Sequence, residues 1–220
     1  MSDLTLIIGN KNYSSWSLRP WFWMKHLGIE FKEIRIPLFT EQTNAQLEKY
    51  YSNYKVPVLL DKEFIVWDSL AILEYLSEKF PLLRGLPDDQ EDRAMVRSVC
   101  AEMHSSFSAM RAELPMNCRK SFSGISLSPE AEEDIARITA IWRYFRRRYE
   151  QKGPWLFGDF TIADAMFAPV VIRFKGYNIA LNEIEQEYVE QVLSQNAMIE
   201  WCHAGKQESE IIAMDEINEQ

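Results

Sequence analysis

The sequence predicts a small α/β domain followed by an all-helical domain, and three observations lead to that fold class. Over residues 4–80, short apolar runs alternate with helical segments, which indicates a sheet that is at least partly parallel. The segment 82–89 contains a glycine and a proline, as a linker does. Beyond it, every regular pattern is helical. We therefore expect a first domain at 1–81, a linker at 82–89 and a helical domain at 90–220.

The first domain follows the order β-α-β-α-β-β-α. Leu4–Ile8 is a short apolar run that ends at a glycine, which is typical of a buried strand before a turn. A polar Asp61-Lys62-Glu63 turn separates two later apolar runs and indicates a hairpin. Pro20 falls in the first turn of the first expected helix, where its missing N–H is tolerated. We expect strands at 4–8, 31–36, 56–60 and 64–66, and helices at 18–27, 41–51 and 69–79.

Helical segments fill the second domain. In the segment 130–149, apolar residues such as Ile138, Trp142 and Phe145 recur at spacings of three and four, which predicts an amphipathic helix. Pro169 lies inside a later segment and should kink it. The tail after Gly205 is acidic, and we expect it to be loosely held. We expect helices at 90–116, 130–149, 161–174 and 183–201, the last as one helix or two.

Composition and charge argue against several classes of function. The 220 residues carry a net charge of −9, and an acidic surface repels phosphate, so nucleic acid is not an expected partner. No apolar run is long enough to span a bilayer, and the first residues lack a secretory signal, so we expect a cytoplasmic protein without membrane contact. The cysteines are scattered without a CxxC pair, which predicts free thiols and no metal site.

Serines follow the first strand, in the run Ser14-Ser15-Trp16-Ser17 just before the first helix. A free thiol has a pKa of roughly 8.5, so it is mostly protonated at neutral pH. The partial positive charge of a helix N-terminus, with a hydroxyl that donates to sulfur, favours the thiolate. One of these serines could supply the hydroxyl. The alternative is that all of them merely cap the helix.

Two further motifs surround the hairpin. Val56-Pro57 opens its first strand, at a position where proline is tolerated at a sheet edge. Asp68-Ser69 begins the next helix, and both residues suit a helix N-cap. A helix N-terminus is also a natural site for a carboxylate, and a neighbouring acid can pair with an ammonium group. Capping and ligand binding can therefore coexist at Asp68-Ser69.

Taken together, the serine loop, Val56-Pro57 and Asp68-Ser69 resemble motifs of the cytosolic glutathione S-transferase superfamily, especially its serine-type, zeta-like and bacterial members. A box at Thr161–Asp164 extends the resemblance over nearly the whole chain. The resemblance implies a thioredoxin-like first domain that binds glutathione as cosubstrate. It also implies a helical second domain that holds a small hydrophobic electrophile, and a homodimer about a two-fold axis.

The resemblance implies roles for individual residues in glutathione binding. Ser14 best matches the catalytic serine, Ser15 is its close rival in the glutathione site, and Tyr13 is a weaker candidate. Val56 would precede a cis proline and offer its backbone to the cysteinyl part of glutathione. The residues expected to hold the glycyl carboxylate and the γ-glutamyl end are Lys55, Asp68 and Ser69.

Asp68 stands where the family has Glu or Gln, so its side chain is one methylene shorter. Thr161 and Asp164 resemble a buried capping box, to which we assign a structural role. The resemblance also implies that the first long helix of the second domain lines the electrophile pocket, although a core location is the alternative for each of its side chains. The candidates on that helix are Met103, Phe107, Met110 and Arg111.

Three functions follow from the resemblance. The first is a glutathione transferase in which a serine activates the thiolate. A glutathione-dependent isomerase of the maleylacetoacetate type is an alternative, but Trp16 stands where such isomerases have a cysteine. Thiol–disulfide exchange in the first domain is excluded, because no cysteine precedes Cys100. A non-enzymatic interaction module with the same fold is the third possibility.

Overall fold

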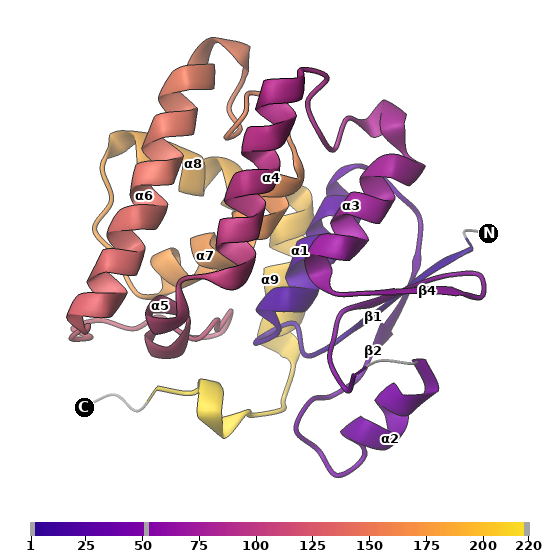
Figure 1. The fold of residues 1–220 in the computed structure, drawn as a ribbon. Helices are drawn as coiled ribbons and strands as arrows, with labels where there is room; N and C mark the ends of the chain where they lie inside the picture. Colours follow the sequence, from indigo (N-terminus) through magenta and orange to yellow (C-terminus); the bar gives the residue numbers. More distant parts are fainter. Residues whose placement is uncertain (1–2, 51–52, 218–220) are drawn as a thin grey trace.

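The computed structural model describes residues 3–50 and 53–217. Its first domain is built on a four-stranded sheet in the order β2-β1-β3-β4 (Figure 1). β1 runs parallel to β2 and antiparallel to β3, and β3 and β4 form the expected hairpin. The strands are β1 (Leu4–Ile8), β2 (Lys32–Arg35), β3 (Val58–Asp61) and β4 (Phe64–Trp67).

Helices cover both faces of the sheet. Leu6 and Ile8 of β1 face the large core shared with the helical domain, whereas Ile7 belongs to a separate small cluster with Leu47. This alternation follows from the two-residue period of a strand. The helices of this domain are α1 (Ser15–His26), α2 (Thr43–Leu47) and α3 (Ser69–Lys79), with a 3-10 turn at Glu48–Tyr50 after α2. The predicted end of the second helix, Tyr51, lies outside the described residues.

Helix α1 begins at Ser15, three residues earlier than predicted. Pro20 therefore lies in the helix interior and not in its first turn. The helix is apolar on most of its surface and is packed against α3, α7 and α9, so tertiary burial outweighs the lost hydrogen bond of proline. This early start brings the helix N-terminus next to Ser14.

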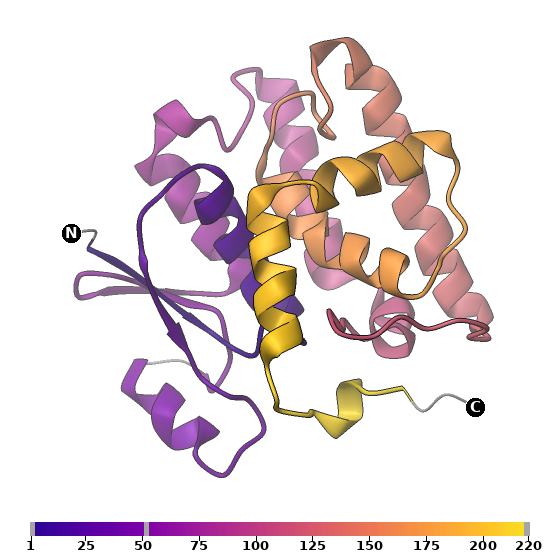
Figure 2. The same ribbon diagram turned by 180° about the vertical axis from the view of Figure 1, so that it is seen from behind.

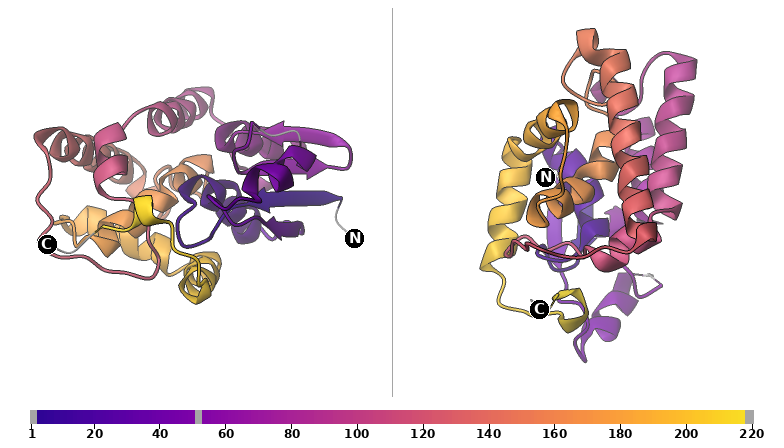
Figure 3. Two further views of the ribbon diagram at one scale, coloured as in Figure 1. Left: turned by 90° about the horizontal axis from the view of Figure 1, so that it is seen from below. Right: turned by 90° about the vertical axis from the view of Figure 1, so that its left-hand side faces the viewer.

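The helical domain surrounds α7, which carries buried residues along nearly its whole length. Figure 2 shows α9 lying against α1, and Figure 3 shows α4 beside α6, where Glu102 and Arg137 form an ion pair. One continuous hydrophobic core spans both domains. The helices are α4 (Gln90–Ser105), α5 (Ser108–Glu113), α6 (Pro129–Tyr149), α7 (Ile162–Gly176), α8 (Glu183–Leu193) and α9 (Asn196–Gln207), with 3-10 turns at Pro81–Leu83, Glu150–Lys152 and Ala213–Asp215.

One prediction for this domain needs correction. The single helix expected at 90–116 is divided into α4 and α5, because Ser106 is extended and Phe107 adopts a left-handed conformation with a φ of 65°. Serine side chains compete with the helical backbone for hydrogen bonds, which favours a break there. α7 continues past Pro169 to Gly176 without ending. Within the described residues, no helix has the length and apolar character needed to cross a membrane.

Candidate functional site

A cavity of about 860 Å³ lies where the two domains meet. Its walls come from the turn after β1, the segment before β3, the start of α3, the helical domain and the C-terminal tail. The structure brings all six residues expected to act on glutathione to this one cavity, although they come from three separate segments. These residues are Ser14, Ser15, Lys55, Val56, Asp68 and Ser69.

Ser14 is held at the N-terminal end of α1 by a tight turn. The backbone N–H groups of Tyr13 and Ser14 both donate to the Asn10 carbonyl, at 3.2 and 2.8 Å. The Ser14 hydroxyl donates to Ser17 Oγ at 2.7 Å, and Ser17 Oγ also accepts from the Gly9 N–H at 3.1 Å. A pair of hydroxyls can reverse its donor direction. Ser17 can therefore donate to Ser14 and leave the Ser14 hydrogen for a ligand sulfur, a supporting role that the sequence did not suggest.

The peptide bond between Val56 and Pro57 is cis, and both residues line the cavity. The paired part of β3 begins only at Val58, two residues later than predicted. Cis X-Pro bonds are uncommon in folded proteins. The Val56 peptide at the cavity wall could pair with an extended peptide ligand.

Asp68 caps α3 and adopts an unusual backbone conformation, with a φ of 75°. Its Oδ1 accepts from the Leu70 and Ala71 N–H groups at 2.9 and 3.4 Å. Its Oδ2 lies 3.2 Å from Nε2 of His104, a residue that sequence reasoning did not single out. Non-glycine residues with positive φ are sparse and often occur at functional sites.

Ser69 is almost fully buried and accepts a long hydrogen bond of 3.4 Å from Arg19 Nη1. The Arg19 guanidinium is completely buried and lies 4.1 Å from the centre of the Trp16 ring. Burial lowers the pKa of Arg19 well below its usual value, and the neighbouring Arg111 and Arg173 lower it further. A buried cation therefore lies directly beneath the start of α3.

The side of the cavity formed by the helical domain differs from the prediction. Arg111 lines it, but Met103, Phe107 and Met110 belong to the buried core and are not part of the wall. Apolar residues at helical spacing do not reveal from sequence whether their face meets a cavity or the core. The helical-domain residues found there instead include His104, Pro115, Met116 and Arg173.

Two arginines, the buried Arg173 and the partly buried Arg111, give this side of the cavity a positive character. Arg111 donates to the carbonyls of Ser106 and Met103, and Arg173 donates to those of Arg111 and Leu114. Among the described residues, neither forms an ion pair with a carboxylate. Burial lowers the pKa of each to about 10, so both stay charged at neutral pH.

The described part of the C-terminal tail, which ends at residue 217, is not loosely held, contrary to expectation. Ile212 is buried, and Ile212, Met214 and Asp215 form part of the cavity wall. The Tyr13 hydroxyl donates to Glu216 at 2.5 Å, and burial is the main cause that raises the pKa of Tyr13. Tyr13 thus anchors the tail, and it lacks the free hydroxyl that thiol activation would need.

Comparison with known proteins agrees with this arrangement. Residues 13–79 match the N-terminal domain model of glutathione S-transferases, and residues 128–192 match the C-terminal domain model. The chain belongs to the glutathione S-transferase superfamily. A probable maleylacetoacetate isomerase of Caenorhabditis elegans is 25% identical over 170 residues, which cover 76% of this chain and 77% of the relative.

Solved structures share the glutathione S-transferase fold over almost the whole chain. A glutathione transferase homolog from Burkholderia, crystallised with bound glutathione, superposes with a TM-score of 0.71 at 22% identity and covers 93% of this chain and 99% of its own. The nitrogen regulation fragment of the yeast prion protein Ure2p gives a TM-score of 0.70 at 18% identity, with 92% and 94% covered. At these identities the likeness is one of fold.

The capping box of this transferase forms as predicted at the start of α7. Thr161 Oγ1 accepts from the Ala163 N–H at 3.3 Å, and Asp164 Oδ2 accepts from the Thr161 N–H at 2.9 Å. Asp164 Oδ1 also accepts from the Leu156 N–H and the Tyr188 hydroxyl, at 3.1 and 3.2 Å. Asp164 is fully buried and far along the chain from Ser14, so the box serves the fold.

Proposed function

We propose that this chain is a glutathione transferase that binds glutathione in the cavity and activates its thiolate through the Ser14 hydroxyl. One observation carries the proposal: the residues that the family resemblance selects, from three segments of the chain, converge on a single cavity. The cavity is large enough for a tripeptide and a small second substrate. We further propose a cytoplasmic location and a homodimer, as the resemblance implies.

In this proposal, each of the three segments contacts a different part of glutathione. The γ-glutamyl carboxylate would lie at the start of α3 beside Ser69, and the ammonium group beside Asp68. The cysteinyl backbone would pair with Val56, and Lys55 would approach the glycyl carboxylate. The sulfur then lies by Ser14, where the N-terminus of α1 and the hydroxyl both favour its negative charge.

Replacement of Ser69 by alanine tests glutathione binding at this site. We expect affinity to fall about 10- to 100-fold, because a hydrogen bond to a charged group contributes about 1.5–3 kcal/mol. Isothermal titration of glutathione into both proteins measures the change. Ser98→Ala, on the exposed face of α4, is the matched control. If the wild type does not bind glutathione, the transferase proposal is wrong, and a non-enzymatic interaction module with this fold replaces it.

The electrophile that best fits the cavity carries a negative charge. The sequence alone suggests a hydrophobic electrophile. However, Arg111 and Arg173 lie in the wall without a carboxylate partner among the described residues, and His104 is near. Cations in such a cavity wall favour a carboxylate, which can accept charge-assisted hydrogen bonds from them. We therefore propose that this transferase prefers acidic electrophiles.

A glutathione-dependent isomerase is the second candidate function, and the same two arginines favour it. The thiolate would add to a conjugated double bond of an acidic substrate and leave again after rotation. The Caenorhabditis elegans relative carries the name of such an isomerase. Trp16 stands at the position where the resemblance implies a cysteine. Its ring centre lies 4.1 Å from the guanidinium of Arg19 and 5.1 Å from that of Arg111, so the ring contacts both cations.

Arg111→Gln tests the preference for acidic electrophiles. We expect kcat/KM for a chlorodinitrobenzoate to fall about tenfold or more, because a charge-assisted hydrogen bond is lost. The neutral chlorodinitrobenzene should react at nearly the wild-type rate. Arg97→Gln, which removes an exposed arginine from α4, is the control for charge. Equal losses for both electrophiles would show that Arg111 supports the fold and does not select the substrate.

A further inference from the structure

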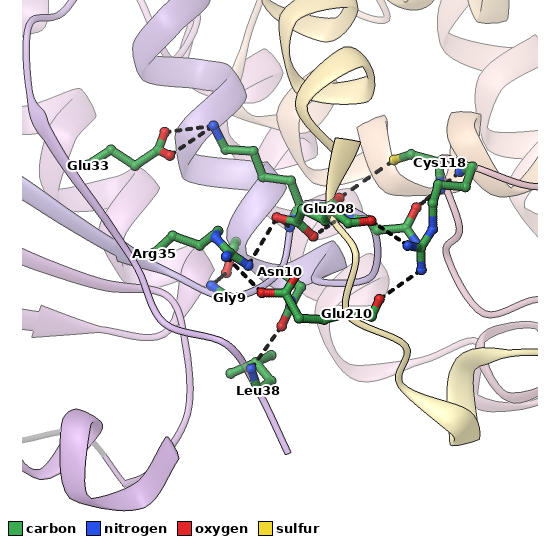
Figure 4. A network of polar contacts seen from close by, with 12 residues as sticks. Gly9, Asn10, Glu33, Arg35, Leu38, Cys118, Glu208 and Glu210 are labelled. Carbon is green, nitrogen blue, oxygen red and sulfur yellow. Dashed lines mark hydrogen bonds and ion pairs between the residues drawn. The ribbon is translucent and has the colours of Figure 1, made fainter. Parts of the chain in front are cut away.

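We propose that Glu208 is a positioning residue of the glutathione site, acting through the turn that holds Ser14. It belongs to a C-terminal brace, residues 205–216, which crosses the outer side of that turn and then forms part of the cavity wall (Figure 4). This inference rests on the proposed function, because its test detects a displacement of Ser14 through the thiolate of bound glutathione.

Glu208 binds two successive backbone N–H groups of the turn. Its Oε1 accepts from the Lys11 N–H at 2.8 Å, and its Oε2 accepts from the Asn12 N–H at 3.1 Å. These two groups remain available because the turn is closed by the Asn10 carbonyl, which accepts from Tyr13 and Ser14. A carboxylate offers an acceptor oxygen to each N–H, so it fixes the turn at two adjacent points.

The carboxylate itself is held in place. Its side chain is only 8% exposed, and Arg35 Nη1, at the end of β2, lies 3.5 Å from Oε1. Arg119 donates from Nη1 to the Glu208 carbonyl at 2.5 Å, and from Nη2 to the Glu210 carbonyl at 2.9 Å. The brace is thus held by an arginine from each domain, close to the point where Glu208 meets the turn.

Two further contacts constrain the turn. Asn12 Oδ1 accepts from the backbone N–H groups of Cys118 and Arg119, at 2.9 and 3.0 Å. Helix α9 approaches so closely that a Cβ atom at Gly205 would lie 3.1 Å from the Asn12 nitrogen and the Lys11 carbonyl carbon. The turn is therefore constrained by Glu208, by the segment at Cys118 and by the close approach of Gly205. Ser14 follows Asn12 by two residues in the same turn.

A small shift of the turn should matter for catalysis. Ser14 must meet the sulfur at hydrogen-bond distance, and misplacement by about 1 Å can cost on the order of 100-fold in rate. The groups proposed to bind the rest of glutathione belong to other segments, so affinity should depend little on the turn. Loss of the Glu208 contact should then reduce thiolate formation and kcat while it leaves the glutathione dissociation constant nearly unchanged.

Glu208→Gln in the full-length protein tests this inference. The amide nitrogen of glutamine replaces one acceptor by a donor that faces a backbone N–H. With chlorodinitrobenzene as electrophile, we expect kcat to fall on the order of 10-fold. The pKa of bound glutathione, followed by thiolate absorbance against pH, should rise by about one unit. Glu210→Gln removes the same charge two residues away, where the carboxylate contacts Arg35 and not the turn, and should match the wild type.

Two further measurements make the outcome decisive. Gly205→Ala should produce the same rise in thiol pKa by pushing the turn from the helix side, and Glu208→Asp should restore only part of the lost activity. A fall in activity with an unchanged thiol pKa, or an equal effect of Glu210→Gln, would overturn the role of Glu208. If the wild type binds glutathione without forming its thiolate, the result contradicts the proposed function itself. The role of Glu208 then falls with it.

Discussion

Replacement of Ser14 by alanine should lower kcat/KM about 100-fold and leave glutathione affinity nearly unchanged. Removal of one hydrogen-bond donor to an anion in an active site typically lowers kcat on the order of 10²- to 10³-fold. The variant keeps the N-terminus of α1 and the groups that bind the glutathione backbone, so the thiol still arrives at the same point. Steady-state kinetics together with isothermal titration of glutathione measure the two effects separately.

The pH dependence gives this prediction a clear sign. A hydroxyl that donates to the thiolate lowers the thiol pKa, so the wild-type rate should already be at its plateau near neutral pH. Without Ser14 the thiol pKa should move toward its free value of roughly 8.5, and the rate should keep rising to higher pH. Ser14→Thr retains the hydroxyl and should restore part of the rate. A full loss in Ser15→Ala with none in Ser14→Ala would assign the role to Ser15.

Local motifs made much of this site predictable from sequence. Ser14, Val56 and Ser69 each lie at the junction of a strand with a turn or helix, and junction chemistry is visible in a few consecutive residues. The alternation of strands and helices then fixes the sheet edge on which such junctions meet. The capping box at Thr161 was predictable for the same reason, because it depends on residues three apart.

Long-range contacts explain what the sequence could not predict. Glu208 meets Lys11 across 197 residues, and no local pattern in an acidic tail indicates that one carboxylate will bind two backbone groups of a distant turn. Arg173 follows an apolar stretch of α7, and only the packing of α7 against the loop after α5 places it at the cavity. Met103 belongs to a set of apolar residues at helical spacing, and that spacing is the same whether the helix face lines the core or a pocket.

Asp164→Ala should produce the largest loss of stability of any substitution considered for this protein. The carboxylate is fully buried and accepts from the backbone N–H groups of Leu156 and Thr161 and from the Tyr188 hydroxyl. Alanine would leave these donors buried without partners, at a cost of about 3–5 kcal/mol. That is a large part of the 5–15 kcal/mol or so that typically stabilises a domain. Urea denaturation followed by tryptophan fluorescence measures the change, with the exposed Asp159→Ala as control.

The pH dependence of that loss follows from the environment of Asp164. Burial raises its pKa to about 6, while the Thr161 and Leu156 donors oppose the rise. An unfolded aspartate titrates near roughly 3.9, so the folded state holds the proton more tightly. The contribution of Asp164 to the free energy of unfolding is then greatest below about pH 4 and declines as the pH rises through about 6. The free-energy gap between wild type and Asp164→Ala should therefore be wider at pH 5 than at pH 7.5. A gap that widens toward alkaline pH would instead mean that the hydrogen-bond donors, and not burial, control the pKa of the carboxylate.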